Sequence, residues 1–425
     1  MTRQITLPYG RESRTIEIPV PNLAWIEGPR HVPAIADLAR AVREAIRNPI
    51  GASTLPELVA RNGKRTLLLV DESTRKTPQK TILPVVLDEL NAAGVADGEI
   101  AAMIALGTHR GMRHDEILER VGEAVMHRVA VENLSHDPAD FVDLGASPLG
   151  IPIHISRRHL ETPITIAVGS IAPHMYAGWS GGAKMVVPGV ADGVTTGRIH
   201  FHAGPRVYEI LGDEENELRR EMETIAARTG LKFIVNVVLN VEGEVACVVA
   251  GDVVKAHRAG VEFARPLFTI DPPETPDIVI ASSHPADRDL WQGFKPVNNC
   301  GMLVKDGGTL ILLIPAPEGI SCDHPQLVEL GVTPEAEVMA KVADGAIKDE
   351  AAAATYLAFD RTRRRIHVTL VTDGISNAEA SKIGISATTS FDDAFAGALT
   401  RHGGQARIGV ITNGADIMAK HKQRE

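Results

Sequence analysis

Hydroxyl, acidic and basic side chains gather in one short segment directly after a predicted strand. The apolar run at residues 66–70 ends at Asp71, and the segment that follows reads Asp71-Glu-Ser-Thr-Arg-Lys-Thr-Pro78. Its hydroxyl groups, its backbone amides and the Arg75 guanidinium group could together bind an anion. The alternative is a capped helix start, with Ser73 or Thr74 as the cap before Pro78. The residues alone leave both interpretations open.

Two histidines follow two further predicted strands at equivalent points. His109 lies in Gly107-Thr-His109-Arg110, after the strand predicted at 101–106, and His174 follows the strand predicted at 164–168. A single histidine is more often structural, but ligands bind beyond the carboxyl ends of strands in open α/β sheets. If these strands are neighbours, both imidazoles converge with Arg75. Stereochemical inversion requires two bases on opposite faces of a substrate, because one removes a proton and the other supplies one.

The most specific feature is the glycine-rich segment 177–189, AGWSGGAKMVVPG. It departs from the phosphate-binding pattern GxxxxGKS/T at Ala183 and Met185, and the chain has no GxGxxG fingerprint for a nicotinamide dinucleotide. What remains is a loop that admits close backbone approach, with Lys184 at its end. A lysine among apolar neighbours is a candidate nucleophile or anchor for a carbonyl or thiocarbonyl group. A phosphate-binding or surface lysine is the alternative.

Imidazole and amide side chains stand further along the chain. His200 and His202 are typical ligands of nickel, zinc, copper or iron, although alternate positions on a strand would also explain them. Trp291, Gln292 and Lys295 follow a strand predicted in the second half of the chain. Gln292 and Lys295 could hydrogen-bond a carboxylate, or they could lie at a domain interface.

Short β-branched runs alternate with helical patterns, which predicts an α/β protein with largely parallel sheets. The proline-rich segment 268–276 is the best candidate for a linker. We therefore expect two α/β domains around an interdomain cleft: a cofactor-binding domain at 1–270 and a substrate-contacting domain at 275–405. A C-terminal helix at about 406–425 is expected to return to the first domain. The expected strands are 66–70, 101–106, 164–168, 233–239, 277–282, 308–314, 366–372 and 408–412.

Charge and cysteine content exclude several classes of protein. The 44 basic and 54 acidic side chains give a net charge of −10, which argues against a nucleic-acid partner. The basic cluster at 361–365 is interpreted as a solvated turn. The three cysteines form no disulfide framework. With no signal peptide and no apolar run of membrane-spanning length, we expect a cytoplasmic protein without membrane contacts.

Taken in order, these segments resemble the nickel-pincer lactate racemase family. The resemblance rests on DESTRKTP, GTHR, the APH segment, GWSGGAKMVVPG with a histidine sixteen residues after its lysine, and WQGFK. It implies an isomerase that inverts C2 of a 2-hydroxy acid by hydride transfer to a cofactor, through a 2-keto acid. The implied cofactor is a nickel complex of a pyridinium bis-thiocarboxylate mononucleotide, and cofactor-making enzymes would be required for its maturation.

The resemblance also implies roles for individual residues. Lys184 would attach the cofactor covalently, and His200 would bind nickel, being preferred over His202 because it has the family spacing. His109 and His174 would be the paired acid/bases. The cofactor-binding loop would comprise Asp71, Glu72, Ser73, Thr74 and Arg75. The substrate contacts would be Arg75, Trp291, Gln292 and Lys295.

Two departures from the family bear on the substrate. Lactate-specific members carry a tyrosine where Trp291 stands, and a later tryptophan that is missing here, with Tyr356 as its candidate replacement. We therefore expect a 2-hydroxy acid that is not strictly lactate. Two alternatives stay open: an NAD-dependent 2-hydroxy acid dehydrogenase, and a homologue that binds a carboxylate or nickel without catalysis.

Overall fold

The computed structural model describes residues 1–420 and divides into two compact units. Unit 1 contains residues 1–30, 200–211 and the chain from Phe268 onward, and unit 2 contains residues 31–199 and 212–267. Residues 1–30, expected in the first domain, instead belong with the C-terminal part of the chain. The reason is that strand β3 (Leu23–Glu27) forms a parallel pair with β19 (Ile408–Ile411).

Unit 2 is built on a six-stranded sheet with the order β13-β12-β9-β4-β5-β6. All neighbouring strands are parallel except β12 and β13, which are antiparallel. Every residue of β4 and β9 is buried, which confirms the apolar runs as central strands. The strands are β4 (Thr66–Asp71), β5 (Ile100–Ala105), β6 (Ala130–Asn133), β9 (Ile164–Ser170), β12 (Leu231–Leu239) and β13 (Val245–Gly251).

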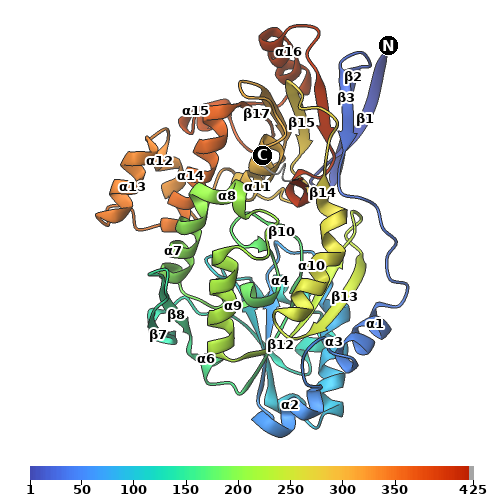
Figure 1. Ribbon diagram of the computed structural model, residues 1–425, viewed down its shortest axis with the longest axis vertical. Coiled ribbons are helices and arrows are strands. Elements are labelled where there is room, and N and C mark those ends of the chain that lie inside the picture. Colours follow the sequence, from blue (N-terminus) through green and yellow to red (C-terminus); the bar gives the residue numbers. More distant parts are fainter. Residues whose placement is uncertain (421–425) are drawn as a thin grey trace. The chain divides into compact units, whose positions relative to one another are not determined.

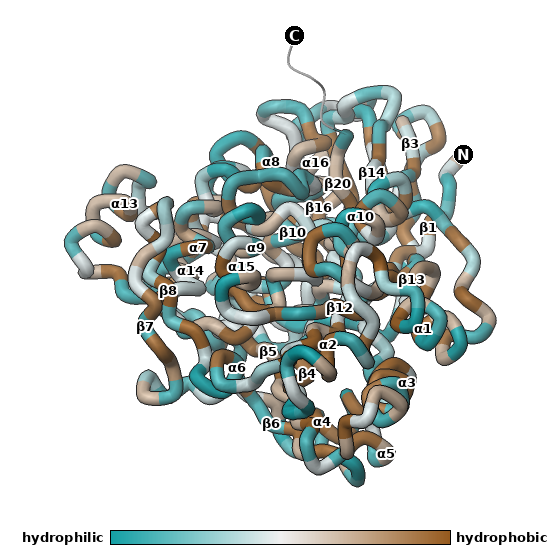
Figure 2. The backbone as a smooth tube through the Cα atoms, turned by 60° about the horizontal axis from the view of Figure 1, so that its bottom comes forward, coloured by the Kyte–Doolittle hydropathy of each residue, from teal (hydrophilic) through white to brown (hydrophobic). Residues whose placement is uncertain are grey.

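Helices and short strands complete unit 2 (Figure 1). Helix α3 continues through Pro84, and its apolar composition is visible in Figure 2. The helices are α1 (Leu38–Arg47), α2 (Leu55–Asn62), α3 (Gln79–Ala92), η1 (Asp97–Glu99), α4 (His114–Val121), α5 (Glu123–Met126), η2 (Pro138–Asp140), α6 (Arg157–Leu160), η3 (Gly182–Met185), α9 (Glu217–Thr229) and α10 (Lys255–Phe268). The short antiparallel pairs are β7 (Phe141–Ala146) with β8 (Pro152–Ser156) and β10 (Pro173–His174) with β11 (Gly178–Trp179).

Unit 1 contains a second six-stranded sheet, entirely parallel, with the order β18-β17-β16-β15-β19-β3. Alternate residues of β15 face two separate hydrophobic clusters, Val279 and Ala281 in one and Ile278 and Ile280 in the other. This alternation is expected for a strand buried on both faces. The strands are β15 (Ile278–Ser282), β16 (Thr309–Leu313), β17 (His367–Val371) and β18 (Ser386–Thr388).

Different elements cover the two faces of this sheet. The hairpin of β1 (Thr2–Tyr9) and β2 (Glu12–Pro19) contributes Ile5, Leu7, Ile16 and Ile18 to one cluster. Helices α11 (Leu290–Gly301) and α14 (Glu350–Arg365) contribute to the other. The remaining elements are η4 (Gly204–Arg206), α8 (Val207–Ile210), β14 (Thr269–Ile270), α12 (Gln326–Leu330), α13 (Glu335–Ala343), α15 (Asn377–Lys382), α16 (Phe391–His402), η5 (Gly414–Asp416) and β20 (Met418–Ala419).

Three local predictions are wrong. Residues 198–202 lie in helix α7 (Gly193–Ala203) and not on a strand. The basic cluster 361–365 forms the last turn of α14, where cations complement the helix dipole. Residues 406–420 form β19, η5 and β20 instead of a helix, while residues 421–425 of that prediction lie outside the described chain. Within residues 1–420, no helix is both long and apolar enough to cross a membrane.

Candidate active site

The three polar segments of unit 2 follow neighbouring strands. β4 pairs with β9 on one side and β5 on the other, so their carboxyl ends lie together. The His109 segment meets the glycine-rich segment, because Gly107 N donates to Gly189 O at 3.0 Å. A Cβ atom at Gly169 would stand 3.3 Å from both Asp71 Oδ2 and Met185 Sδ. The structure therefore brings the Asp71, His109, His174 and Lys184 segments to one edge of the sheet.

Asp71 supports the loop that it opens. Its carboxylate accepts hydrogen bonds from Thr77 Oγ1, from Gln79 Nε2 at 2.8 Å, and from Arg120. Arg120 also donates to Asp71 O at 3.0 Å and to Arg75 O at 2.6 Å. Both carboxylate oxygens are thus bound within the protein, so Asp71 fixes the shape of the segment that carries Arg75.

The alternative of a capped helix start is wrong for this loop. Helix α3 begins at Gln79, and its N-cap, Pro78, makes no side-chain capping bond. Thr74 instead donates its hydroxyl group to Glu72, and Thr74 N donates to Glu72 Oε2 at 2.6 Å. The hydroxyl of Thr74 therefore belongs to the loop and not to the helix.

Glu72 links the Asp71 loop electrostatically to His109. Burial alone would raise the pKa of Glu72, but the charges of His109 and Arg75 and the two bonds from Thr74 lower it to about 2. The side chain is 6% exposed. Glu72 is therefore a buried carboxylate that stays ionised because cationic groups from two loops face it.

His174 lies on the short strand β10, opposite Gly178 of β11. Tyr176 N donates to His174 Nδ1 at 3.2 Å, which leaves the proton of the neutral imidazole on Nε2. His174 is buried, whereas His109 is half-buried and has its backbone N–H bonded to Leu106 O at 3.0 Å. The two imidazoles thus come from separate loops at the same sheet edge.

Lys184 stands out from the segment around it. Every residue from Pro173 to Ala191 is buried except Lys184, which is partly exposed. The glycines before it allow close approach by the protein's own side chains: a Cβ atom at Gly182 would lie 2.9 Å from both Arg219 Nη2 and His257 Cδ2. Gly182 N also donates to Asn236 Oδ1 at 2.8 Å. A tightly packed loop therefore presents one amine.

The predicted substrate contacts of unit 1 lie on helix α11. Asp289 caps this helix by accepting from Gln292 N at 2.8 Å, and Lys295 Nζ donates to Gln292 Oε1 at 2.7 Å. The Trp291 ring stacks on His324, with ring centroids 3.9 Å apart and an interplanar angle of 17°. Trp291, Gln292 and Lys295 thus share the first turns of one capped helix.

His324 is an aromatic neighbour that the sequence patterns do not reveal. Its Nδ1 atom lies 2.8 Å from Asp349 Oδ2, so the ring that covers Trp291 is itself oriented. Tyr356, by contrast, is fully buried, and its hydroxyl group donates to Thr333 O. The expectation that Tyr356 replaces a pocket tryptophan is therefore wrong, because its side chain belongs to the core of unit 1.

His200 and His202 lie at the end of α7, in the segment that belongs to unit 1, whereas Lys184 belongs to unit 2. The residues after them are fixed against α14: Arg361 Nη1 donates to Pro205 O at 2.6 Å. A Cβ atom at Gly204 would lie 2.6 Å from Ala354 O. Both histidines are half-buried.

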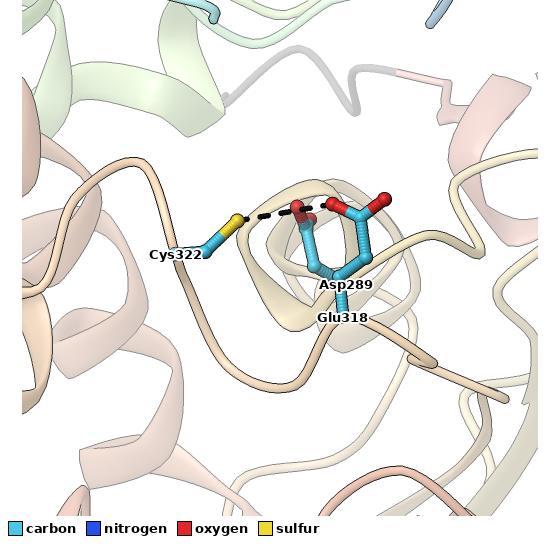
Figure 3. A group of neighbouring side chains, drawn as sticks. All are labelled: Asp289, Glu318 and Cys322. Atoms are coloured by element: carbon cyan, nitrogen blue, oxygen red, sulfur yellow. Dashed lines mark hydrogen bonds between the residues drawn. The ribbon is translucent and has the colours of Figure 1, made fainter.

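Within residues 1–420, one group of three side chains has the types and proximity of metal ligands: Asp289, Glu318 and Cys322 (Figure 3). Arg288 already pairs with Asp289 at 2.8 Å and with Glu318 at 3.4 Å. Burial and the neighbouring carboxylates raise the pKa of the Cys322 thiol, which disfavours the thiolate that a metal requires. This group is an ion-pair cluster, and it includes neither His200 nor Lys184.

Sequence reasoning missed the residues that hold the loops in place. These residues belong to no motif and lie far along the chain from the segments that they contact. Three of them bind the loops of unit 2, namely Arg120, Arg219 and His257, and His324 stacks on Trp291. The available signal was weak: α9 carries Arg219 in a charged stretch, where residue type alone does not separate a buried arginine from an exposed one.

Comparison with known proteins supplies the class of the chain. The N-terminal domain model of lactate racemase matches residues 9–207, and the C-terminal domain model matches residues 272–419. A lactate racemase from Lactiplantibacillus plantarum is 27% identical over 98% of this chain and 99% of the relative. One from Thermoanaerobacterium thermosaccharolyticum is 29% identical over 74% of this chain and 75% of the relative.

Solved structures agree with these matches. The lactate racemase apoprotein from Thermoanaerobacterium thermosaccharolyticum superposes with a TM-score of 0.86 at 25% identity, covering 99% of this chain and 100% of the other. A protein from Thermotoga maritima shares the fold, with a TM-score of 0.69, 18% identity and coverage of 92% and 99%. The chain is thus an α/β isomerase of the racemase type, which sets aside the dehydrogenase alternative. It belongs to the lactate racemase family.

Proposed function

We propose that this racemase inverts C2 of a 2-hydroxy acid and depends on a nickel-pincer nucleotide attached to Lys184. The observation that carries the proposal is the exposure of Lys184 within a segment whose other residues, from Pro173 to Ala191, are all buried. Such a segment offers one amine for covalent attachment, at a fixed place beside the Asp71, His109 and His174 loops.

The donor set fits a metal that arrives with organic ligands. His200 has an imidazole of the kind that suits nickel. Within the described chain, it belongs to no group of three metal-ligating side chains. A nickel ion at His200 therefore requires ligands from a bound group, and the pincer cofactor provides them.

Different side chains have separate roles in the reaction. When bound, the cofactor would supply a hydride acceptor for the C2 hydrogen. His109 and His174 remove and return the hydroxyl proton, one for each enantiomer of the substrate. Arg75 and Lys295 bind the substrate carboxylate through charge-assisted hydrogen bonds, and Gln292 donates to it.

The Asp71 loop holds the cofactor and positions Arg75. Glu72, Ser73 and Thr74 line the cofactor-binding side, with Glu72 as the fixed negative charge between Arg75 and His109. Asp71 acts from within the loop, since both of its carboxylate oxygens are bound to Thr77, Gln79 and Arg120. We assign it a supporting role and no direct contact with the cofactor.

The substrate is a 2-hydroxy acid with a side chain larger than the methyl group of lactate. Trp291 lies one turn before Lys295 on α11, so a carboxylate bound by Lys295 places the rest of the molecule near the indole. The stack on His324 keeps that indole in one orientation. A rigid aromatic surface of this kind favours a branched or aryl side chain.

Co-expression with the cofactor-making enzymes tests the cofactor. We expect a covalent adduct that peptide mapping places on Lys184, with about one nickel per chain. Lys184→Arg keeps the positive charge and is expected to lose the adduct. An unmodified Lys184 without nickel, from a host shown to load a known racemase, contradicts the proposal and favours a non-catalytic binding protein.

A panel of C2-deuterated 2-hydroxy acids tests the substrate. We expect racemisation with retention of the label for branched or aryl members of the panel, because the hydrogen returns from the cofactor. Lactate as clearly the best substrate contradicts the assigned side-chain preference. Rapid loss of deuterium to water contradicts the hydride route.

A further inference from the structure

Three consecutive carbonyl groups before Lys184 are bound by two side chains from other elements. Arg219 on α9 donates from Nη1 to Trp179 O at 3.3 Å and from Nη2 to Gly181 O at 3.2 Å. His257 on α10 donates from Nε2 to Ser180 O at 2.9 Å. We call these two side chains the Arg219–His257 pair. Together they fix the backbone of the loop.

Both members of the pair are fully buried. Burying such polar groups costs free energy unless their hydrogen bonds are made within the protein. The charge of Arg219 is balanced by Glu223, at 3.1 Å from Nε. His257 Nδ1 lies 3.2 Å from Arg258 Nη1 and accepts from it, while Nε2 donates to Ser180 O and also contacts Arg219 Nη2. Burial lowers the pKa of His257 and keeps this ring neutral.

The loop has glycines at the points where side chains from other elements pack closely against its backbone. Gly182 has φ +57°, and a Cβ atom there would stand 2.9 Å from Arg219 Nη2 and from His257 Cδ2. On its other side, a Cβ atom at Gly181 would stand 2.7 Å from Asn236 Oδ1, which accepts from Gly182 N at 2.8 Å. The backbone is therefore held from two sides, and only glycine fits between them.

The held backbone leads directly to the lysine. Lys184 N donates to Gly181 O at 3.3 Å, and Gly181 O is the same oxygen that Arg219 binds. The turn of η3 follows at once and places Lys184 as its third residue. A displacement of the carbonyls at 179–181 therefore moves the backbone of Lys184 with it.

We propose that the Arg219–His257 pair positions Lys184 for attachment to its cofactor. This inference rests on the proposed function. Neither residue is catalytic: they act on Lys184 through the backbone of residues 179–181. The physical reason is that a covalent bond to a bulky group forms only when the amine stands at the right place, and small misplacements are expensive in reactions of this kind.

Matched substitutions separate positioning from a general loss of stability. His257→Leu removes the donor to Ser180 O, whereas His257→Gln keeps an amide N–H at a similar reach. Arg219→Lys keeps the charge but loses the fork that serves two carbonyls. The control is His159→Leu: His159 is also fully buried in unit 2, but its ring contacts Thr165 and Thr229 and not the loop.

Amide hydrogen exchange in the full-length chain without cofactor gives the first readout. In His257→Leu and Arg219→Lys we expect exchange within residues 179–186 to rise about tenfold or more, because the local opening free energy falls. His159→Leu is expected to leave these amides at the wild-type rate, and His257→Gln to restore most of their protection.

The fraction of chains with an adduct on Lys184 after co-expression gives the second readout. We expect about a tenfold loss in His257→Leu, recovery in His257→Gln and a normal fraction in His159→Leu. Normal exchange and a normal adduct fraction in His257→Leu overturn the inference, as does faster exchange with a normal adduct fraction. Absence of the adduct from the wild-type chain instead marks failure of the proposed function itself.

Discussion

The two units carry their proposed site residues in different ways. In unit 1, Trp291, Gln292 and Lys295 lie on one regular helix, and a cap formed by Asp289 sets where that helix begins. In unit 2, Arg75 lies in a loop and Lys184 in the single turn of η3, and the backbone of both segments is held by side chains from other elements. A helix positions its residues through local sequence, whereas a loop needs partners that are distant in the chain. The two regions should therefore respond differently to substitution.

The largest effect is expected at the paired histidines, which both depend on loop geometry. His109→Ala and His174→Ala should each lower kcat by about 10³-fold, since each removes a group that transfers a proton. Nickel content and the adduct on Lys184 should stay at wild-type levels in both variants. Loss of nickel in either variant would assign that histidine to the cofactor and not to acid/base chemistry.

The next effect tests how far the Asp71 loop depends on its distant partner. Arg120→Met removes the cationic partner of the buried Asp71 carboxylate and should lower the free energy of unfolding by about 3–5 kcal/mol. Denaturation in urea measures this loss. Arg113→Ala, which breaks exposed pairs with Asp115 and Glu116, is the control and should lower the free energy of unfolding far less, because solvent screens exposed ion pairs. Similar losses in the two variants would show that the buried pair holds the Asp71 loop no more strongly than exposed pairs hold the surface.

A pH series tests the buried carboxylate of the same loop. The pKa of Glu72 falls from 4.5 to about 2 on folding, so its ionised form stabilises the folded chain above pH 4.5. This contribution, about 3 kcal/mol, is lost as the pH falls from about 4.5 toward 2. The stability difference between wild type and Glu72→Gln should therefore shrink across that window. A difference that is constant from pH 7 to pH 3 would show that the Glu72 charge is not stabilised.

The smallest effect is expected in unit 1, where the helix needs little outside help. Asp289→Ala removes the cap of α11 and should cost about 1 kcal/mol, whereas Asp289→Asn keeps an acceptor for Gln292 N and should cost less. Thermal unfolding compares the two. A loss in Asp289→Ala as large as that in Arg120→Met would mean that helix-borne residues depend on single contacts as strongly as loop-borne ones.

The same contrast explains what could be predicted from the sequence. The runs at 66–70, 101–106 and 164–168 are apolar over a strand's length, so the strands and the polar residues at their ends could be located. Whether β4, β5 and β9 are neighbours depends on topology, which single runs do not encode. A strand stayed open as an alternative explanation of His200 and His202, because two alternating positions are too few to distinguish a strand from the end of a helix.

The residues that support the loops could not be predicted from the sequence, for a physical reason. In the sequence, Arg219 and His257 look like ordinary helix residues. They bind the backbone of residues 179–181 only once α9 and α10 have packed against that segment. The place of residues 1–30 in unit 1 could not be predicted for the same reason, since no pattern in residues 23–27 indicates that they pair with a strand near residue 410. Long-range pairing is a property of the folded chain and not of a segment.

The pairing of β3 with β19 has a consequence for how the protein is made. β3 leaves the ribosome long before β19, so this edge of the sheet stays open while all the residues between the two strands are translated. During that time the apolar side of the first hairpin, with Leu7 and Ile18, has no completed core to enter. β3 and β19 thus complete this sheet together, and a nascent chain that stops before residue 408 leaves an unpaired strand edge open to aggregation.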